Sequence, residues 1–477
     1  MHTDTPFPVD PHAVNGKIPA PAEHYGLVVV GAGPAGIAAA REGAAAGKRV
    51  LLVDEHPVPG HLMGTDVPLF FGGRMTAATQ NPGRMIESVF ATLPELEAAM
   101  EDGIELLLGT AAWGVYRNGP AIGTLPAQML GLADAERGWM VGFDELVLAT
   151  GARDLALAFP GWNQPGVMGA GGFAMLVARY QAFAGRRIVI MGTHDLAVET
   201  ARLAQEHGIE VAALVETRDS PQADVGNLPL HTGCVIAEAI GGIDGVKAVR
   251  LSDGTEIVCD TVVQAVGAVP AIELIDAMGG ARVMDPVRGG WVPAENGTVR
   301  CVGLAAGLPD TGFNHMAYRA QWVDALGAVS APDTIVCQCE EVTRADLIGV
   351  QPPNYLKRPP AMCARSLDTL LADGPPNQDQ IKRLTRAGMG QCQGRRCREQ
   401  VSLILGAVSG KPVPLASHRA PVRPIPLKIL ADWEEDQSMR DGWDVWFGIP
   451  TQWIPYRDIG TDREKQHQDV IGGNMSL

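Results

Sequence analysis

The chain of 477 residues is long enough for about three ordinary domains, so a large core and a cleft between domains are both expected. Its 38 lysine and arginine residues are outnumbered by 54 aspartate and glutamate residues, and the basic residues are scattered along the chain. The resulting charge of −16 argues against a nucleic-acid or anionic-membrane surface, and the 57 glycines and 35 prolines favour an α/β enzyme over a coiled coil or a disordered chain.

The beginning of the chain shows no membrane or export signal. Residues 1–23 are rich in proline, histidine and aspartate without a period, which predicts an N-terminal extension. The longest apolar stretch, residues 27–40, is interrupted by three glycines and a proline, so no transmembrane segment is expected. No basic stretch is followed by an apolar one, and we therefore expect a cytoplasmic protein with reduced thiols.

The first regular pattern begins near Tyr25. A strand over residues 27–30, a glycine-rich turn, a helix over residues 35–46 and a strand over residues 49–53 make a βαβ unit. Such a unit implies a parallel sheet, so the expected fold class is α/β with Rossmann-like dinucleotide-binding domains.

The turn of this unit has the spacing of a dinucleotide-binding motif. Its residues are Gly31, Ala32, Gly33, Pro34, Ala35 and Gly36. They let the backbone approach a pyrophosphate at the positive end of the helix dipole. Asp54 and Glu55 end the next strand, where a carboxylate can hold a ribose hydroxyl. An adenine dinucleotide is the predicted ligand, and the alternative is a glycine turn that only packs helix on strand.

A second unit of the same kind follows later in the chain. It has a predicted strand over residues 187–191, a helix over residues 196–205 and a strand over residues 210–215. Its turn begins at Gly192 but places His194 where the second glycine is needed, so a side chain fills the space of a pyrophosphate. This pattern predicts a degenerate NAD(P)-type domain, with a purely structural domain as the alternative.

The strands around this unit indicate that it is inserted into the first domain. A strand over residues 145–150 ends at Gly151, another is expected over residues 261–266, and a third over residues 299–306 ends at Gly307. The predicted divisions are an extension (1–23), a discontinuous first domain (24–155 and 270–330), the degenerate domain (156–269), a cysteine-containing domain (331–410) and a tail (411–477).

The first cysteine of the chain is Cys234. Residues 1–233 contain none, which excludes a redox-active disulfide in the first domain. Cys337, Cys339, Cys392 and Cys397 form two close pairs in glycine-rich loops and can hold a [2Fe–2S] cluster or a zinc ion. A single residue between paired cysteines is unusual for zinc, so the cluster is favoured and structural zinc is the alternative.

The predicted tail differs from the rest of the chain. Five prolines within residues 412–426 are followed by Trp433, Trp443, Trp446 and Trp453, without helical or strand periodicity. Rigid segments with aromatic anchors are enriched at interfaces, so the tail is expected to be covered by a neighbouring subunit.

Several stretches together resemble one family. They are Leu-Ala-Thr-Gly-Ala-Arg at 148–153, Phe-Pro-Gly-Trp at 159–162, Pro-Gly-Val-Met at 165–168, Thr-Arg-Ala-Gly-Met-Gly at 385–390, and Cys-Gln-Gly-Arg at 392–395. In these stretches the chain resembles the α subunits of opine oxidase, D-hydroxyproline dehydrogenase and hydrogen cyanide synthase, and residues 110–116 are similar to the sarcosine oxidase α subunit. The resemblance implies FAD on the first domain, with Gly151 and Gly307 beside it, and a [2Fe–2S] cluster in the cysteine-containing domain. It also implies a flavoprotein β subunit of the amino-acid-oxidase type and allows for a small third subunit.

One departure from this pattern leaves the first ligand open. Flavin reductases of this fold usually have an aspartate after the glycine of the last strand, whereas Gly307 is followed by Leu308 and the nearest acid is Asp310. An adenine nucleotide without a flavin is therefore an alternative to FAD.

The expected function is an electron-transfer α subunit of a multi-subunit flavin-dependent enzyme that oxidises secondary amines or N-substituted amino acids. The substrate-oxidising flavin would belong to the partner. Two alternatives remain, an NAD(P)H-dependent flavin reductase and a zinc-stapled scaffold subunit.

Overall fold

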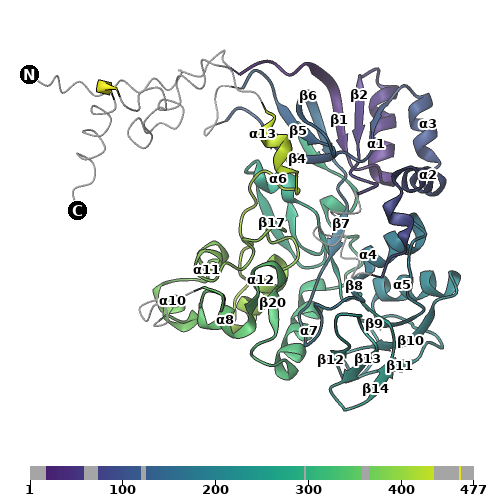
Figure 1. Ribbon diagram of the computed structural model, residues 1–477, viewed down its shortest axis with the longest axis vertical. Coiled ribbons are helices and arrows are strands. Elements are labelled where there is room, and N and C mark those ends of the chain that lie inside the picture. Colours follow the sequence, from purple (N-terminus) through teal and green to yellow (C-terminus); the bar gives the residue numbers. More distant parts are fainter. Residues whose placement is uncertain are drawn as a thin grey trace, which may run out of the picture.

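The computed structural model describes residues 18–58, 74–119, 125–294, 297–356, 365–433 and 461–463. Most of the predicted extension (1–17) and much of the predicted tail (434–460 and 464–477), including Trp443, Trp446 and Trp453, lie outside the described residues. Figure 1 shows two sheets stacked along the long axis of the molecule, with a smaller, mainly helical unit beside them. No helix within the described ranges is both long and apolar enough to cross a bilayer.

The first sheet has seven strands. They are β1 (Glu23–Val30), β2 (Val50–Val53), β3 (Glu105–Leu107), β4 (Ala111–Tyr116), β5 (Met129–Ala133), β6 (Gly138–Leu148) and β19 (Val299–Cys301). The order is β3-β2-β1-β6-β5-β4, with β19 also pairing β6. The pairs around β1 and β2 are parallel, whereas β5 is antiparallel to both of its neighbours, β4 and β6.

Helix α1 (Pro34–Ala45) packs on β1 and β2, and it can do so closely because it carries small residues. A Cβ added at Gly43 would lie 2.3 Å from the Leu27 side chain. Helix α3 (Glu95–Glu101) packs against α1, and α2 (Pro82–Thr92) precedes it. This βαβ arrangement confirms the expected α/β fold class and fixes the turn before α1.

The second sheet is entirely parallel. Its strands are β8 (Val167–Gly169), β9 (Arg187–Met191), β10 (Glu210–Val215), β11 (Leu230–His231) and β15 (Thr261–Gln264), in the order β11-β10-β9-β15-β8. Helices α4 (Ala170–Ala174) and α5 (Asp195–Glu206) belong to this layer, and a π-helical turn over Met175–Arg179 follows α4. An antiparallel sheet of β12 (Ile236–Ile240), β13 (Ala248–Leu251) and β14 (Glu256–Val258) lies next to it.

The chain passes between the two sheets in two adjacent segments. Strand β7 (Ala152–Asp154) pairs antiparallel with β16 (Ala268–Pro270), and the Thr150 hydroxyl donates to the Ala271 carbonyl oxygen at 2.7 Å. After the second sheet, β19 returns to the first sheet beside β6. The strand predicted over residues 299–306 is too long, because β19 ends at Cys301 and a 3-10 turn over Gly303–Ala306 follows, where Gly303 has φ +60°.

The remaining elements complete the molecule. They are α6 (Glu273–Ala277), β17 (Arg282–Asp285), β18 (Gly290–Pro293), α7 (His315–Val329), β20 (Ile335–Cys337), β21 (Val342–Thr343), α8 (Arg344–Gly349), α10 (Leu367–Asp373), α11 (Gln378–Thr385), α12 (Arg398–Ser409) and α13 (Leu427–Ala431). Helix α12 packs on α7, and α11 packs on α8.

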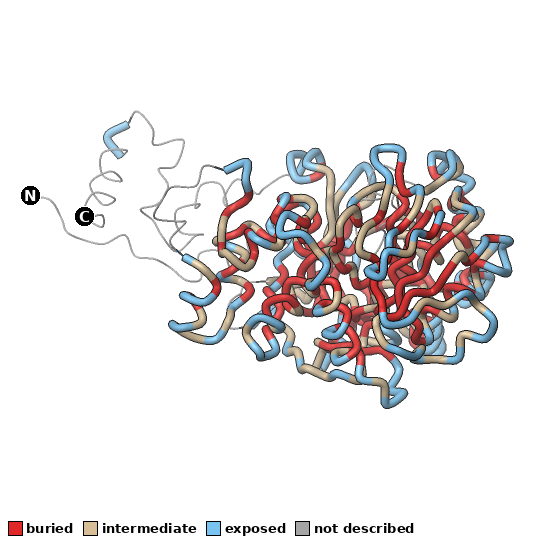
Figure 2. Tube along the Cα trace, turned by 90° about the horizontal axis from the view of Figure 1, so that it is seen from below, coloured by how far each residue is buried: buried red, intermediate tan, exposed pale blue. Residues whose placement is uncertain are grey.

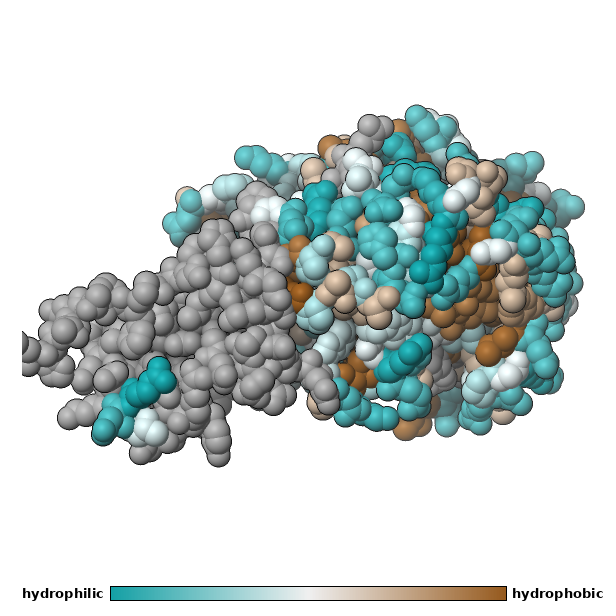
Figure 3. All heavy atoms as spheres, turned by 90° about the horizontal axis from the view of Figure 1, so that it is seen from above, coloured by the Kyte–Doolittle hydropathy of each residue, from teal (hydrophilic) through white to brown (hydrophobic). Residues whose placement is uncertain are grey.

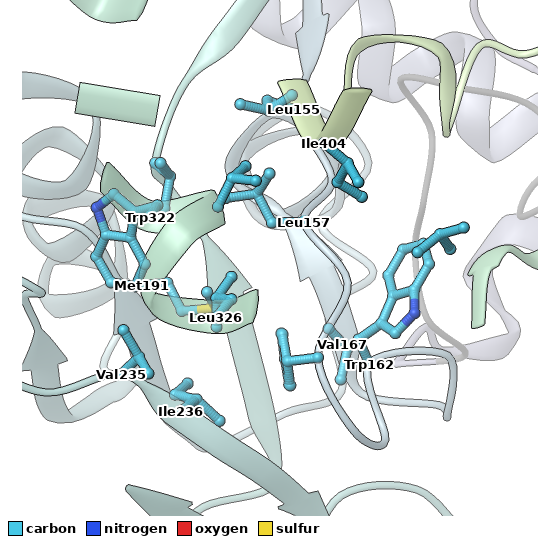
Figure 4. Packing of buried hydrophobic residues seen from close by; sticks show 14 of the residues in the cluster. Leu155, Leu157, Trp162, Val167, Met191, Val235, Ile236, Trp322, Leu326 and Ile404 are labelled. Carbon is cyan, nitrogen blue, oxygen red and sulfur yellow. The ribbon is translucent and has the colours of Figure 1, made fainter. Parts of the chain in front are cut away.

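One hydrophobic core joins the second sheet to the cysteine-containing unit. Figure 4 shows Trp162, Trp322 and Ile404 among its members, together with residues of the second sheet. The Trp162 indole donates to the Ile335 carbonyl oxygen at 2.6 Å, which ties a loop before β8 to β20. Residues in the strands of both sheets are mostly buried, whereas many residues in the connecting loops are exposed (Figure 2).

The described part of the predicted tail packs on this chain itself. Val422 and Ile429 are buried, and Trp433 stacks edge-to-face on Trp113 of β4 with ring centroids 5.9 Å apart. In Figure 1, α13 lies beside β4 and β5. The expectation that a neighbouring subunit covers this tail is therefore wrong for these buried side chains, because Val422 and Ile429 pack on the first sheet of the same chain.

Candidate functional site

The turn after β1 forces the backbone close to neighbouring segments. Gly31 has φ +107°, and a Cβ there would lie 2.3 Å from the Ala149 carbonyl oxygen. A Cβ on Gly36 would lie 1.8 Å from the Gly31 carbonyl oxygen. At Gly33, by contrast, an added Cβ would meet nothing within 4 Å. The turn therefore keeps a free space at the start of α1, where backbone N–H groups can face a pyrophosphate.

The two acidic residues after β2 have different partners. Asp54 accepts hydrogen bonds from the backbone N–H of Ala32 at 2.5 Å and of His56 at 2.7 Å. Glu55 forms an ion pair with Arg423, which comes from the C-terminal part of the chain. Since the carboxylate of Asp54 shapes the turn, we expect a ribose contact from Glu55 rather than from Asp54.

Two cavities meet at the glycine turn. One has a volume of about 230 Å³ and extends toward the ends of β2 and β4. The other has a volume of about 580 Å³ and lies between the start of α1, including Ala35, and the segment after β19. They share Gly33, Ala149 and Gly151. An elongated ligand such as a dinucleotide can therefore lie across the turn with one half in each cavity.

The second of these cavities has a polar end. Gly307 has φ +135°, and a Cβ there would lie 2.8 Å from the Arg288 guanidinium. Arg288 donates to the Ala306 carbonyl oxygen at 2.7 Å, while Leu308 and Asp310 complete the lining. The structure thus brings the predicted Gly307 to the same cavity as Ala35 and Gly151, and it adds Arg288, which the sequence pattern did not reveal.

The first cavity collects positive side chains from four distant segments. They are Arg153, Arg179, Arg395 and Arg423, and His56, Thr110 and Glu273 also contribute to the wall. Arg153 and Arg395 lie within stretches that resemble the family, although nothing in those stretches predicts that they share one cavity. Arg179 and Arg423 follow no local pattern, since only the three-dimensional fold brings β7, the π-helical turn, the second cysteine loop and the tail together.

A buried ion-pair network borders this cavity. Arg153 is 1% exposed and pairs with Glu273 on α6 and with Glu399 on α12. Burial alone would raise the pKa of Glu273, but Arg153, His418 and Arg398 together outweigh burial and lower the pKa to about 2. The network therefore keeps Glu273 charged, and the pair of Arg153 with Glu399 holds α12 against the first domain.

The corresponding site of the second unit is filled by side chains. His194 lies in the turn after β9, and its ring contacts those of Phe313 and Tyr318. Glu216, at the end of β10 where a ribose would bind, accepts hydrogen bonds from the hydroxyls of Thr193 and Tyr318. These side chains fill the turn and engage the end of β10, and the loss of dinucleotide binding that His194 suggests stays a prediction.

The four predicted metal ligands come from two loops that lie against each other. The Sγ atoms of Cys337 and Cys339 are 4.0 Å apart, and those of Cys339 and Cys392 are 3.7 Å apart. Cys397 lies close enough to Cys337 for the two thiols to affect each other's pKa. Two thiolates on one tetrahedral metal, at a metal–sulfur distance of about 2.3 Å, would be about 3.8 Å apart, so these spacings suit a shared metal.

Glycine residues let the loops approach the sulfurs. The backbone N–H of Gly388 donates to the Cys337 sulfur at 3.5 Å, and a Cβ on Gly390 would lie 2.4 Å from the Cys339 sulfur. Among the described residues, no group of three or more His, Cys, Asp or Glu side chains surrounds one common metal position. The sulfurs instead follow one another in a row of contacts. The structure thus brings these predicted ligands together.

On the face shown in Figure 3, the coloured residues are mostly hydrophilic, and hydrophobic residues gather in patches among them. This distribution agrees with the acidic composition of the chain.

Comparison with known proteins supports the resemblance over most of the chain. One of the opine oxidase subunits of Agrobacterium tumefaciens is 26% identical over 490 residues, which cover 86% of this chain and 92% of that protein. The hydrogen cyanide synthase component HcnB of Pseudomonas aeruginosa is 25% identical, covering 84% of this chain and 97% of that protein. The sarcosine oxidase alpha subunit of Rhizobium meliloti is 28% identical over 400 residues, covering 78% of this chain but only 38% of that longer protein.

A solved structure and a family match identify the fold. The L-proline dehydrogenase from P. horikoshii has a similar fold, with a TM-score of 0.55 at 20% identity, and the match covers 85% of this chain and 79% of that chain. The family described as pyridine nucleotide-disulphide oxidoreductase matches residues 25–292, which include the second sheet and all but one strand of the first. The chain therefore belongs to the pyridine nucleotide-disulphide oxidoreductase family.

Proposed function

We propose that this chain is the electron-transfer α subunit of a multi-subunit flavin-dependent enzyme that oxidises secondary amines or N-substituted amino acids. The opine oxidase and sarcosine oxidase relatives are named as subunits of those oxidases, and both match most of this chain. The substrate-oxidising flavin would belong to a β subunit of the amino-acid-oxidase type. The disulphide chemistry in the family's name has no counterpart in the first domain, because residues 1–233 lack cysteine.

One observation carries this proposal. The loop from Cys392 to Cys397 supplies two thiols to the cysteine group and Arg395 to the wall of the first cavity. Two cofactor sites therefore share one loop. A [2Fe–2S] cluster accepts one electron at a time and a flavin accepts two, so neighbouring sites of these kinds can convert a two-electron oxidation into single-electron steps.

FAD is the proposed ligand of the two joined cavities. The open space at Gly33 suits a pyrophosphate, and Glu55 lies where the adenosine ribose would be. The second cavity, beside Gly307 and Arg288, has a volume of about 580 Å³ for the other half of a dinucleotide. An adenine nucleotide without a flavin remains the alternative, since Leu308 follows Gly307 where an aspartate would favour a ribityl chain.

The four cysteines are proposed to hold a [2Fe–2S] cluster. Each sulfur would bind as thiolate, and the pKa of Cys339 is raised to about 11, first because its thiol hydrogen-bonds with that of Cys337. The positive charge of a metal would offset this cost, and the N–H of Gly388 would stabilise the thiolate of Cys337. The second candidate, structural zinc in a scaffold subunit, is favoured by the same sulfur spacing, which suits one tetrahedral ion.

The alternative of an NAD(P)H-dependent flavin reductase is less well supported. Such an enzyme would need an open nicotinamide dinucleotide site in the second unit. There, His194 and Tyr318 fill the turn and Glu216 is already engaged by two hydroxyls.

The test is to express the chain with the genes that neighbour it, purify the complex without oxygen, and measure its metals and flavins. We expect about two irons per chain and a rhombic paramagnetic signal after reduction. Cys339→Ser should lose the iron, whereas Cys234→Ser, a buried cysteine of the second unit, should keep it. One zinc and no iron would overturn the cluster and favour the scaffold.

The same complex tests the reaction. Dye reduction should be seen with a panel of N-alkyl amino acids when the chain is assembled with its partner, and not with the isolated chain. Full activity of the isolated chain would overturn the proposed role as an electron-transfer subunit.

A further inference from the structure

Residues 418–433, here called the C-terminal strap, are fixed to the chain at both ends. At the start of the strap, the backbone N–H of His418 donates to the Asp276 carboxylate on α6 at 2.8 Å. Near its end lies α13, where Ile429 is 3% exposed and packs with Trp113 of β4. Figure 1 shows α13 beside β4 and β5. The strap therefore runs from α6 to the edge of the first sheet.

The middle of the strap forms part of the wall of the first cavity, to which Val422 and Arg423 both contribute. The Val422 N–H donates to the Trp113 carbonyl oxygen at 2.8 Å. The Val422 carbonyl oxygen accepts from the Arg395 guanidinium, which lines the same cavity. These two hydrogen bonds hold the strap against β4 on one side and against the second cysteine loop on the other.

Arg423 meets the carboxylate that is expected to hold the ribose. Its side chain is 13% exposed and pairs with Glu55, which follows β2 and lines the same cavity. A guanidinium in such a pair fixes the direction of the carboxylate, so Glu55 can be held ready for ribose hydroxyls. The guanidinium also adds positive charge to a wall near which a phosphate would lie. A chain whose strap is detached would lose this partner of Glu55 and one side of the cavity.

We propose that the strap is part of the nucleotide site, with Val422 and Arg423 as nucleotide-binding residues, so that an adenine nucleotide binds the chain more tightly when the strap is docked. The inference deepens the proposed function and rests on it, because it needs an adenine nucleotide in the first cavity. A ligand shifts an equilibrium only as far as its affinities for the two forms differ. Here the difference comes from the wall that only the docked strap supplies.

Thermodynamic linkage makes this inference reciprocal. The factor by which full detachment of the strap weakens nucleotide binding equals the factor by which a saturating nucleotide lowers the equilibrium constant for detachment. A factor of about ten or more is expected, within the usual range of such couplings. Both sides of this equality can be measured.

The first measurement uses the unaltered full-length chain after its bound nucleotide has been removed, with ADP as the probe. Trypsin cleavage after Lys428 in α13 reports detachment, because the protease cuts a segment that has left its docked position. Saturating ADP should slow this cleavage at least about tenfold, as followed by mass spectrometry of the released fragment. Cleavage after Lys247, which is exposed in the inserted unit and lines neither cavity, should keep its rate.

The second measurement detaches the strap at a residue that lies outside the lining of the first cavity. Ile429→Asp places a carboxylate where no partner compensates its burial, so the strap should be mainly detached. Equilibrium dialysis should then show ADP binding weakened at least about tenfold. Leu427→Asp changes an exposed residue of the same helix and should bind ADP as the unaltered chain does.

A third comparison tests the role of Arg423 itself. Arg423→Gln should weaken ADP binding about tenfold, and Arg423→Lys should keep part of the affinity. Without ADP, the strap of Arg423→Gln should be cut more slowly than that of Ile429→Asp, which would show that the lost affinity does not come from detachment alone. Arg419→Gln removes an exposed charge from the same strap and should leave ADP binding unchanged.

The outcomes separate this inference from the proposed function. If ADP binds the unaltered chain but leaves cleavage after Lys428 unchanged, the inference is wrong and the proposed function stands. If the unaltered chain binds neither ADP nor FAD, the nucleotide site of the proposed function is wrong and the inference falls with it. Full ADP affinity in Ile429→Asp, with its strap cut at the rate of an unfolded peptide, would also overturn the inference. The comparison with and without ADP in the unaltered chain needs no variant to fold.

Discussion

Single glycines in the first turn serve two different purposes. Gly31 and Gly36 allow the turn to close on the carbonyl of Ala149 and on itself, so a side chain at either position would collide with backbone. Gly33 faces open space, so its missing side chain matters to a ligand rather than to the fold. The same sequence motif therefore contains residues for folding and a residue for binding.

This distinction predicts opposite results for two substitutions. Gly33→Val should leave the melting temperature near that of the unaltered chain. It should weaken nucleotide binding roughly ten- to hundredfold, because the valine side chain would clash with the pyrophosphate and cost about 1–3 kcal/mol of binding free energy. Gly36→Ala should lower the melting temperature, since its Cβ would lie 1.8 Å from a carbonyl oxygen. Thermal unfolding and release of bound nucleotide measure the two effects. Unchanged nucleotide content in Gly33→Val would show that the ligand does not lie at this turn.

Some residues of the site could be predicted from local sequence motifs, and others could not. Gly31, Gly36 and Asp54 follow a local spacing that the geometry of a βαβ unit imposes, so a pattern could predict them. Arg179 and Arg423 reach the cavity from a π-helical turn and from the tail, and no local rule links these segments to β1. Tertiary packing alone decides which of the chain's arginines meet there.

At the scale of elements, strands and helices with strong periodicity were predicted closely, and the weakly patterned segments were not. Strands β9 and β10 occupy the residues expected from their apolar runs. Strand β19 is shorter than expected because Gly303 turns the chain, and a run of apolar residues does not show where a glycine adopts positive φ. Helix α13 was not predicted, because five residues are too few for a helical period to appear.

The docking of α13 can be tested by two substitutions on one helix. Ile429 is 3% exposed and packs toward Trp113 and Gly138, whereas Leu427 is 81% exposed. Ile429→Asp should detach the helix, because a carboxylate cannot be buried there without a partner, and should speed trypsin cleavage after Lys428 at least about tenfold. Leu427→Asp should leave the cleavage rate nearly unchanged. Equal rates in the two variants would mean that the tail does not pack on the first sheet.

At the scale of the whole molecule, its units are joined by a common hydrophobic core and by buried ion pairs. The inserted sheet, α7 and the cysteine-containing unit meet in one hydrophobic cluster, which includes Trp162, Trp322 and Ile404 (Figure 4). Buried ion pairs of Arg153 with Glu399 and of Arg398 with Asp276 then connect the cysteine-containing unit to the first domain. The cysteine loops are therefore positioned by the rest of the chain, and a metal at the thiols would depend on contacts far from it.

This shared core predicts that the inserted unit and the cysteine-containing unit unfold together. Trp162 is 1% exposed and donates to the Ile335 carbonyl oxygen, so Trp162→Ala should cost about 3–5 kcal/mol through lost packing and an unpaired carbonyl. In urea, far-ultraviolet circular dichroism and the reactivity of the cysteine thiols should both move to lower denaturant by the same amount, as two probes of one cooperative transition do. Val258→Ala, at a side chain that is 67% exposed in the same inserted unit, should move neither probe. If the thiols became reactive in a separate, earlier transition, the cysteine-containing unit would be an independent domain, and the common core would not be what holds the cysteine loops in place.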